Sequence, residues 1–134
     1  MSESTSVPRM SIRSFTIDSA DPYRIAQWWC QAFGVPPSPE DFPDDPAALC
    51  ELPDGPRLLF ERVPEPKVVK NRAHIDILAG LRRDEEVERL IDLGASLFAD
   101  FRQPDGSGFV VLADPDGNEF CVERGERDMP GPGA

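Results

Sequence analysis

The sequence contains one histidine in 134 residues, and this scarcity limits the metal chemistry that it can support. An iron site built from two histidines and one carboxylate cannot be formed with His74 alone. A zinc site with three histidines is excluded for the same reason. A metal bound by this chain would therefore take its other ligands from carboxylates or thiolates.

Cysteines and long apolar runs are also scarce. Cys30, Cys50 and Cys121 are an odd number at wide spacings, without a CxxC pair, which is typical of reduced thiols in a cytoplasm. No apolar run approaches the roughly 18 residues of a transmembrane helix. The first residues, MSESTSVPRMS, lack the apolar region of a signal peptide. We therefore expect a cytoplasmic protein without a membrane partner.

Positively charged residues are also few: the chain has 14 Lys and Arg residues and 25 Asp and Glu residues. The resulting net charge of −11 would repel nucleic acid and anionic membranes, so we expect neither as a partner. A neutral or cationic small molecule remains compatible with this charge. Hydrophobic residues make up 40% of the chain, which is enough for one globular domain with a core.

The first half of the chain begins with a strand and a helix. Residues 11–18 alternate between apolar and polar side chains, which predicts a half-buried strand. Asp21 and Pro22 then predict the start of a helix that runs to about Phe33 and ends at Gly34. Five prolines at 35–47 predict a long loop with at most an edge strand.

The first half ends with a hairpin, and the pattern of strand, helix and strands then restarts at residue 73. A Pro-Asp-Gly turn at 53–55 predicts a hairpin between strands at 47–52 and 57–63. A further strand at 73–78 and a helix from a cap at Asp84 to Gly94 follow, and then strands at 96–101, 108–113 and 119–123. We therefore predict one α+β domain over 11–123 with two βαβββ modules, at about 11–63 and 71–123. Residues 1–10 and 124–134 are expected to be flexible tails.

Three stretches carry a resemblance to a known family: IRSFTIDSADP near the start, RLLFERVPEPKVVKNRAHIDI in the middle and DPDGNEFCVE near the end. Over residues 12–123 the chain resembles the glyoxalase/bleomycin-resistance group, the vicinal-oxygen-chelate superfamily, and its glyoxalase-like subgroup most of all. The resemblance implies a curved, mostly antiparallel sheet of eight strands around a concave cavity. It also implies a homodimer.

Four cavity-facing positions are implied by the resemblance: Ser14, Leu59, His74 and Cys121. Metal-dependent members hold His or Glu at these positions, and His74 alone fits that pattern. We therefore expect no cofactor. If a divalent metal is bound, the side chains expected to hold it are His74, Glu61 and Glu119, with Asp76 as another carboxylate nearby.

Strand alternation assigns more residues to the same face as these four positions. The predicted ligand site consists of Ser14, Thr16, Glu61, His74, Asp76, Glu119 and Cys121, with His74 and Glu119 as candidate catalytic residues. The opposite faces are predicted to pack against the helices, through Phe15, Ile17, Leu58, Phe60, Ile75, Ile77, Phe120 and Val122. Burying so many acids without partners would be costly, so the site face should be wet, metal-bound or filled by a ligand.

Several of these residues have a plain structural interpretation beside the functional one. His74 could bind a ligand or act as a base, or it could simply form a hydrogen bond to a neighbouring carboxylate. Cys121 is favoured as a small buried apolar residue, although a thiolate ligand is the alternative. Trp28 and Trp29 could stack on a ligand, but their helical spacing with Ile25 favours the core for at least one.

Three functions remain open from the sequence. The first is a small-molecule-binding glyoxalase-like protein, with or without enzyme activity, that lacks the usual metal ligands. The second is a metal-dependent lyase or isomerase that uses His74 and nearby carboxylates. The third is a dimer that sequesters a cationic drug in an acidic groove. A ring-cleaving dioxygenase ranks last because one histidine cannot form its iron site.

Overall fold

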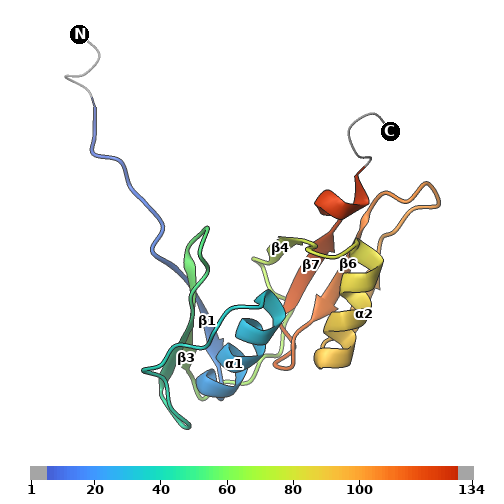
Figure 1. The fold of residues 1–134 in the computed structure, drawn as a ribbon. Helices are drawn as coiled ribbons and strands as arrows, with labels where there is room; N and C mark the ends of the chain where they lie inside the picture. Colours follow the sequence, from blue (N-terminus) through green and yellow to red (C-terminus); the bar gives the residue numbers. More distant parts are fainter. Residues whose placement is uncertain (1–5, 130–134) are drawn as a thin grey trace. The chain divides into compact units, whose positions relative to one another are not determined.

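The computed structural model describes residues 6–129 of the chain. These residues form two compact units, with the boundary between Arg62 and Val63 (Figure 1). The boundary lies at the end of the first of the two modules expected from the sequence, about 11–63. Each unit contains one α-helix and one sheet, which confirms the α+β class.

The first unit contains β1 (Ser14–Ser19), α1 (Pro22–Phe33), β2 (Ala47–Cys50) and β3 (Arg57–Arg62). The strands form a sheet in the order β1-β3-β2. β1 runs parallel to β3, since α1 carries the chain back before β3 begins, and β2 is antiparallel to β3. The hairpin predicted around the Pro-Asp-Gly turn is therefore confirmed.

α1 has the bounds that its capping residues predict. The Asp21 carboxylate accepts a hydrogen bond from the backbone N–H of Arg24, and Pro22 is the first helical residue. Gly34 ends the helix with φ 72°, a left-handed conformation that glycine adopts without steric cost. Trp28 and Trp29 are both buried, so both belong to the core.

The proline-rich segment between α1 and β2 contains no strand. It covers the outer edge of β2 instead: Asp41 Oδ2 accepts from the Leu49 N–H at 2.8 Å, and Asp45 Oδ1 accepts from the Ala47 N–H at 3.3 Å. Proline lacks the N–H that a strand needs, so five prolines leave this unit with three strands. The predicted eight-stranded sheet is therefore not confirmed.

The second unit contains β4 (Ile75–Leu78), α2 (Arg83–Leu93), β5 (Ser96–Asp100), β6 (Phe109–Ala113), β7 (Glu119–Glu123) and a short 3-10 helix, η2 (Glu126–Asp128). Its sheet has the order β4-β7-β6-β5. As in the first unit, the strand before the helix pairs in parallel with a later strand, here β4 with β7. The β5–β6 and β6–β7 pairs are antiparallel, and α2 lies along one face of this sheet (Figure 1).

The start of α2 differs from the prediction that Asp84 caps it. The helix begins at Arg83, and its first N–H donates to Asp128 Oδ2 at 2.8 Å, a residue 45 positions further along the chain. The buried Arg83 guanidinium donates through Nη1 to the carbonyl oxygens of Gly106, Ser107 and Gly108. Arg83 therefore ties the start of α2 to the turn before β6.

The segment directly after β7 contacts the rest of the second unit. We expected a flexible tail at 124–134, but Gly125 is buried and its N–H donates to Asp128 Oδ2. A Cβ atom at Gly125 would lie 1.9 Å from the Ala79 carbonyl oxygen, so the backbones are in close contact here. Residues 130–134 of the expected tail, and residues 1–5 of the other, lie outside the described part of the chain.

The predicted buried faces agree best with the structure on the central strands. Leu58, Phe60, Phe120 and Val122 are all at most 2% exposed. The corresponding residues on β1 and β4, which are edge strands of their sheets, are covered less well, and Phe15 is 50% exposed. The prediction of a buried Phe15 was therefore wrong, because an edge strand has a neighbouring strand on one side only.

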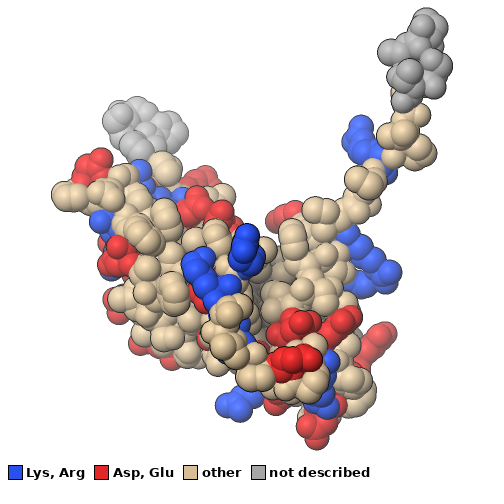
Figure 2. Space-filling view, turned by 180° about the vertical axis from the view of Figure 1, so that it is seen from behind, with Lys and Arg blue, Asp and Glu red and all other residues tan. Residues whose placement is uncertain are grey.

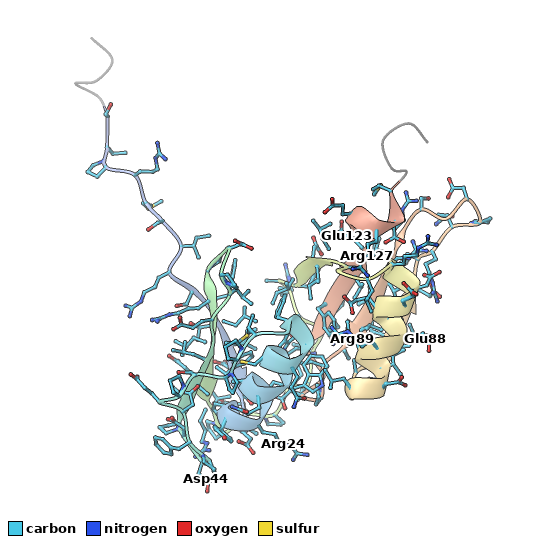
Figure 3. All side chains as sticks on the ribbon, viewed as in Figure 1. Arg24, Asp44, Glu88, Arg89, Glu123 and Arg127 are labelled. Carbon is cyan, nitrogen blue, oxygen red and sulfur yellow. The ribbon has the colours of Figure 1, made fainter. Side chains whose placement is uncertain are left out.

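Charged side chains are distributed over the described surface. Asp and Glu side chains occur at several separate places on the face seen in Figure 2. On α2, Arg89 pairs with Glu86 across 2.6 Å, and Glu88 points outward (Figure 3). Within residues 6–129, no helix has the length and apolar character needed to cross a membrane.

Candidate functional site

The parallel pairing of β4 with β7 brings three predicted site residues together in the second unit. Asp76 on β4 is the register partner of Cys121 on β7, so their side chains lie on the same face of the sheet. His74 lies two residues before Asp76 and, by alternation, shares that face. Among residues 6–129, these three residues form a group whose candidate ligand atoms all lie within 4.8 Å of one another.

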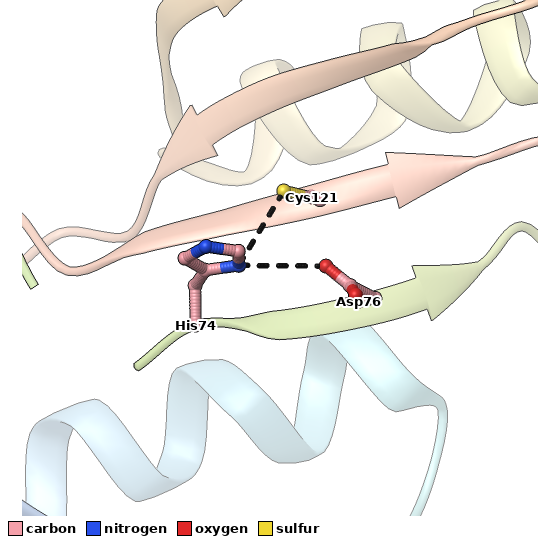
Figure 4. A group of neighbouring side chains, drawn as sticks. All are labelled: His74, Asp76 and Cys121. Carbon is pink, nitrogen blue, oxygen red and sulfur yellow. Dashed lines mark hydrogen bonds and ion pairs between the residues drawn. The ribbon is translucent and has the colours of Figure 1, made fainter. Parts of the chain in front are cut away.

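One nitrogen of His74 faces both neighbours (Figure 4). Its Nδ1 atom lies 3.5 Å from Asp76 Oδ1 and 3.8 Å from Cys121 Sγ. The imidazole and carboxylate are open to solvent, with side-chain exposures of 42% and 57%, while Cys121 is buried. The site thus has a buried sulfur at its base and two exposed donors above it.

The Cys121 thiol is held in its protonated form. Burial, the largest cause, and a hydrogen bond with the Asp76 carboxylate raise the pKa of this thiol to about 11. A thiol with this pKa is a weak nucleophile at neutral pH. This agrees with the interpretation of Cys121 as a buried residue and argues against nucleophilic catalysis.

Glu119, a candidate catalytic residue from the sequence, is engaged by hydrogen bonds in the structure. Its carboxylate is buried and accepts from Lys67 Nζ at 2.9 Å and from the Asn71 N–H at 2.8 Å. Burial would raise the pKa of Glu119, but these hydrogen bonds outweigh it and hold the pKa below its ordinary value. With both oxygens engaged, Glu119 fastens the segment before His74 to β7.

The turn before β7 is held by its own side chains. Asp114 Oδ1 accepts from the N–H groups of Asp116 and Asn118, both at 2.9 Å. Gly117 has φ 90°, a conformation that favours glycine. The Asn118 side chain also accepts from the Asn71 amide at 3.1 Å. The turn therefore fixes the start of β7 and the segment that leads to His74.

Ser14, Thr16 and Glu61 belong to the first unit. Alternation and register place them on one face of its sheet, as predicted. Ser14 Oγ accepts from Arg57 Nε at 3.3 Å, so its hydroxyl is engaged by the side chain of its register partner. That these residues share one ligand site with His74 stays a prediction.

The first unit also contains a groove that the sequence did not reveal. The groove encloses about 550 Å³ and is lined by the proline-rich segment together with residues of β2 and β3, namely Val35, Pro36, Pro37, Ser38, Pro39, Glu40, Leu49, Glu51, Leu52, Pro53 and Arg57. Alternation assigns Leu49 and Arg57 to the same face as Ser14. The density of prolines predicted a long loop, and the folding of this loop over β2 makes it the wall of a groove.

A family model for the glyoxalase-like domain matches residues 14–123 of the sequence. The chain belongs to the glyoxalase-like domain family. The match covers both units and places the protein in the vicinal-oxygen-chelate superfamily, as the sequence resemblance implied. Among curated proteins, none matches the sequence significantly.

Solved structures give the same fold for this glyoxalase-like chain. It is similar to a glyoxalase/bleomycin resistance protein/dioxygenase family enzyme from Burkholderia phytofirmans PsJN, with a TM-score of 0.66 and 18% identity over 86% of this chain and 98% of that one. It is also similar to a lactoylglutathione lyase from Agrobacterium tumefaciens, with a TM-score of 0.60 and 19% identity over 89% and 96%. These likenesses concern the fold.

Proposed function

We propose that this glyoxalase-like protein binds a small oxygen-bearing molecule at His74, Asp76 and Cys121, together with a divalent transition metal that these residues hold. The convergence of Asp76 Oδ1 and Cys121 Sγ on the Nδ1 atom of His74 carries the proposal. The usual ligand set implied by the family is incomplete here, so this set uses an aspartate and a cysteine in its place.

The spacing of the donors supports a shared ion. Atoms bound to one tetrahedral ion at about 2.0–2.3 Å lie about 3.5 Å apart. The two distances from His74 Nδ1, 3.5 and 3.8 Å, are close to that value. The 3.5 Å between Nδ1 and Asp76 Oδ1 is long for a direct hydrogen bond between nitrogen and oxygen. Nδ1 also carries at most one N–H, so it cannot donate to both neighbours at once.

The chemistry of the donors indicates which ions fit. An imidazole nitrogen, a carboxylate oxygen and a cysteine sulfur suit zinc, cobalt or nickel, whereas magnesium and calcium prefer oxygen alone. Metal binding would displace the proton of the Cys121 thiol, since the thiolate is the form that binds a metal. Three protein ligands leave a position for another group, as catalytic zinc sites do. An ion held there would polarise an oxygen of the bound molecule.

The residues around the three ligand atoms determine how accessible the site is to a small molecule. The exposed imidazole and carboxylate leave the site accessible, while buried Cys121 closes its base. Glu119 is engaged by Lys67 and Asn71, so it supports the site and does not act as its base in this proposal. Binding of a small molecule is therefore the function that we infer, and we assign no reaction.

Cobalt binding tests the proposal, because a thiolate bound to cobalt absorbs in the near ultraviolet. Chelator-treated full-length protein is titrated with cobalt(II), and then with zinc to displace it. We expect a charge-transfer band that zinc removes. Cys121→Ser should abolish the band, Asp76→Asn should weaken cobalt binding at least tenfold, which is about 1.4 kcal/mol, and Cys30→Ser should keep the band.

Two results would contradict metal binding by this site. One is the absence of a cobalt-dependent band in folded wild-type protein at saturating cobalt. The other is a band that persists in Cys121→Ser, which would place the metal elsewhere. Circular dichroism of each variant confirms that the fold is retained.

A further inference from the structure

Two cysteines that do not belong to the His74 site lie together in the core of the first unit. Cys30 is on the last turn of α1, and Cys50 is the last residue of β2. They are 2% and 0% exposed. The Cys30 Sγ atom lies 3.9 Å from the carbonyl oxygen of Leu49, the residue directly before Cys50.

Packing holds the two thiols in the same layer. Cys50 alternates with Leu49, so its side chain lies on the face of β2 that α1 covers, together with Ala48. Its register partner on β3 is the buried Leu58. Cys30 and Cys50 therefore lie in the same buried layer, with the Cys30 sulfur against the backbone that leads into Cys50.

We propose that Cys30 and Cys50 are a redox modification site, which hydrogen peroxide converts into a disulfide that links α1 to β2. All three cysteines are free thiols in the structure, so the link would form only on oxidation. Both thiols are buried, and peroxide is small enough to reach a packed core during brief local opening.

The pKa values of the two thiols are shifted in opposite directions. A hydrogen bond from Cys50 lowers the pKa of Cys30, although burial and the nearby Asp41 carboxylate act in the opposite direction. The same interaction, together with burial, raises the pKa of Cys50. We therefore take Cys30 as the sulfur that reacts with the oxidant and Cys50 as the one that resolves the product, and the Cys50 variant tests this assignment.

The reaction balances with peroxide as the only oxidant. The Cys30 thiolate attacks one peroxide oxygen, the O–O bond breaks, and a sulfenic acid and hydroxide are formed. The Cys50 sulfur then attacks the Cys30 sulfur and displaces the sulfenic oxygen, which leaves as water with the thiol proton. Two thiols are oxidised to one disulfide, and one peroxide is reduced to two waters.

The link would fix a wall of the groove in the first unit. The chain between Cys30 and Cys50 contains the residues from Val35 to Glu40 and Leu49, all of which line the groove. A disulfide across the ends of this segment restricts its motion. Oxidation would therefore stiffen one side of the groove while leaving its lining residues unchanged.

Mass spectrometry of the full-length protein tests the proposal. Reduced protein is treated with peroxide under native conditions, quenched with acid, unfolded and alkylated with N-ethylmaleimide. We expect a mass lower by two hydrogen atoms, one maleimide adduct on Cys121, and a peptide that joins Cys30 to Cys50. Dithiothreitol should restore three adducts.

Variants assign the roles of the individual cysteines. Cys121→Ser should form the same disulfide and take up no maleimide. In Cys50→Ser the sulfenic acid on Cys30 should persist and be trapped by dimedone; Cys50→Ala replaces this variant if the serine prevents folding.

Three outcomes would overturn the proposal. The first is a wild-type protein that still takes up three maleimide adducts after treatment with a peroxide concentration that oxidises Cys30 in the Cys50 variant. The second is a disulfide that includes Cys121. The third is a Cys30–Cys50 link that forms only in denaturant, because native packing would then have no part in it.

Discussion

The Nζ atom of Lys67 lies 2.9 Å from Oε1 of Glu119, and this ion pair joins the segment before β4 to the first residue of β7. The second oxygen of Glu119 accepts from the Asn71 N–H. His74 follows this segment closely in the chain. Glu119, which is not one of the three proposed metal ligands, therefore helps to position the backbone that carries the imidazole. Glu119, a candidate catalytic residue from the sequence, thus holds the segment that leads to His74.

Glu119→Gln should destabilise the second unit. The side chain is 4% exposed, and the substitution removes the charge that Lys67 and Asn71 bind. A hydrogen bond to a charged group contributes about 1.5–3 kcal/mol, so we expect a loss of about that size in the free energy of unfolding. Urea denaturation measures it. Glu88→Gln, at an exposed position of α2, is the matched control and should change stability by at most about 0.5 kcal/mol; equal effects of the two variants would contradict the role of Glu119.

Stability should fall in acid because of buried, paired carboxylates. The pKa values of Glu119 and Glu86 are lowered in the fold: burial opposes this, but hydrogen bonds from Lys67 and Asn71, and from Arg89 and Gly80, outweigh it. A lowered pKa contributes stability that is present above the ordinary value, about 4.3, and is lost as the pH falls through the folded value. The urea midpoint should therefore drop below about pH 4. Glu119→Gln should show a shallower drop, and an identical pH profile would exclude Glu119 as a contributor.

Two leucines paired across β5 and β6 should differ in their contribution to stability. Leu97 and Leu112 are register partners, but Leu97 on the edge strand is 55% exposed and Leu112 is 0% exposed. Leu112→Ala should cost about 2–5 kcal/mol because it leaves a cavity in the core. Leu97→Ala should cost less than about 1 kcal/mol, since most of its surface is already in water. Thermal and urea unfolding of both variants check this, and a loss at Leu97 as large as at Leu112 would show that Leu97 is covered in solution.

Asp128→Ala tests whether the segment after β7 belongs to the fold. Asp128 Oδ2 accepts from the first N–H of α2 and from the Gly125 N–H, and it places negative charge at the positive end of the helix. Loss of a capping side chain costs about 0.5–2 kcal/mol. Glu126→Ala removes an exposed acid of η2 and serves as the control. If both variants unfold at the wild-type urea concentration, the tail would begin at 124, as the sequence suggested.

The sequence alone was sufficient for features that depend on neighbours a few residues apart. The cap at Asp21, the proline after it and Gly34 determined α1, because these residues act on the backbone within one helical turn. Alternation with period two assigned Phe60, Phe120 and Val122 to the core, and His74, Asp76 and Cys121 to one face. The turn at Asp114–Asn118 is likewise formed by local hydrogen bonds.

Tertiary structure decided which long-range partner each polar side chain has. Nothing in the local sequence connects Glu119 with Lys67, Arg83 with the carbonyl groups at 106–108, or Asp128 with the start of α2, because these partners are 23 to 52 positions apart. Alternation assigns a side chain to a face, but strand order determines whether that face is covered, which is why Phe15 and Leu97 on edge strands remain exposed. The convergence of Asp76 and Cys121 on a single nitrogen of His74 likewise required the parallel register of β4 and β7, which forms only when the chain has folded.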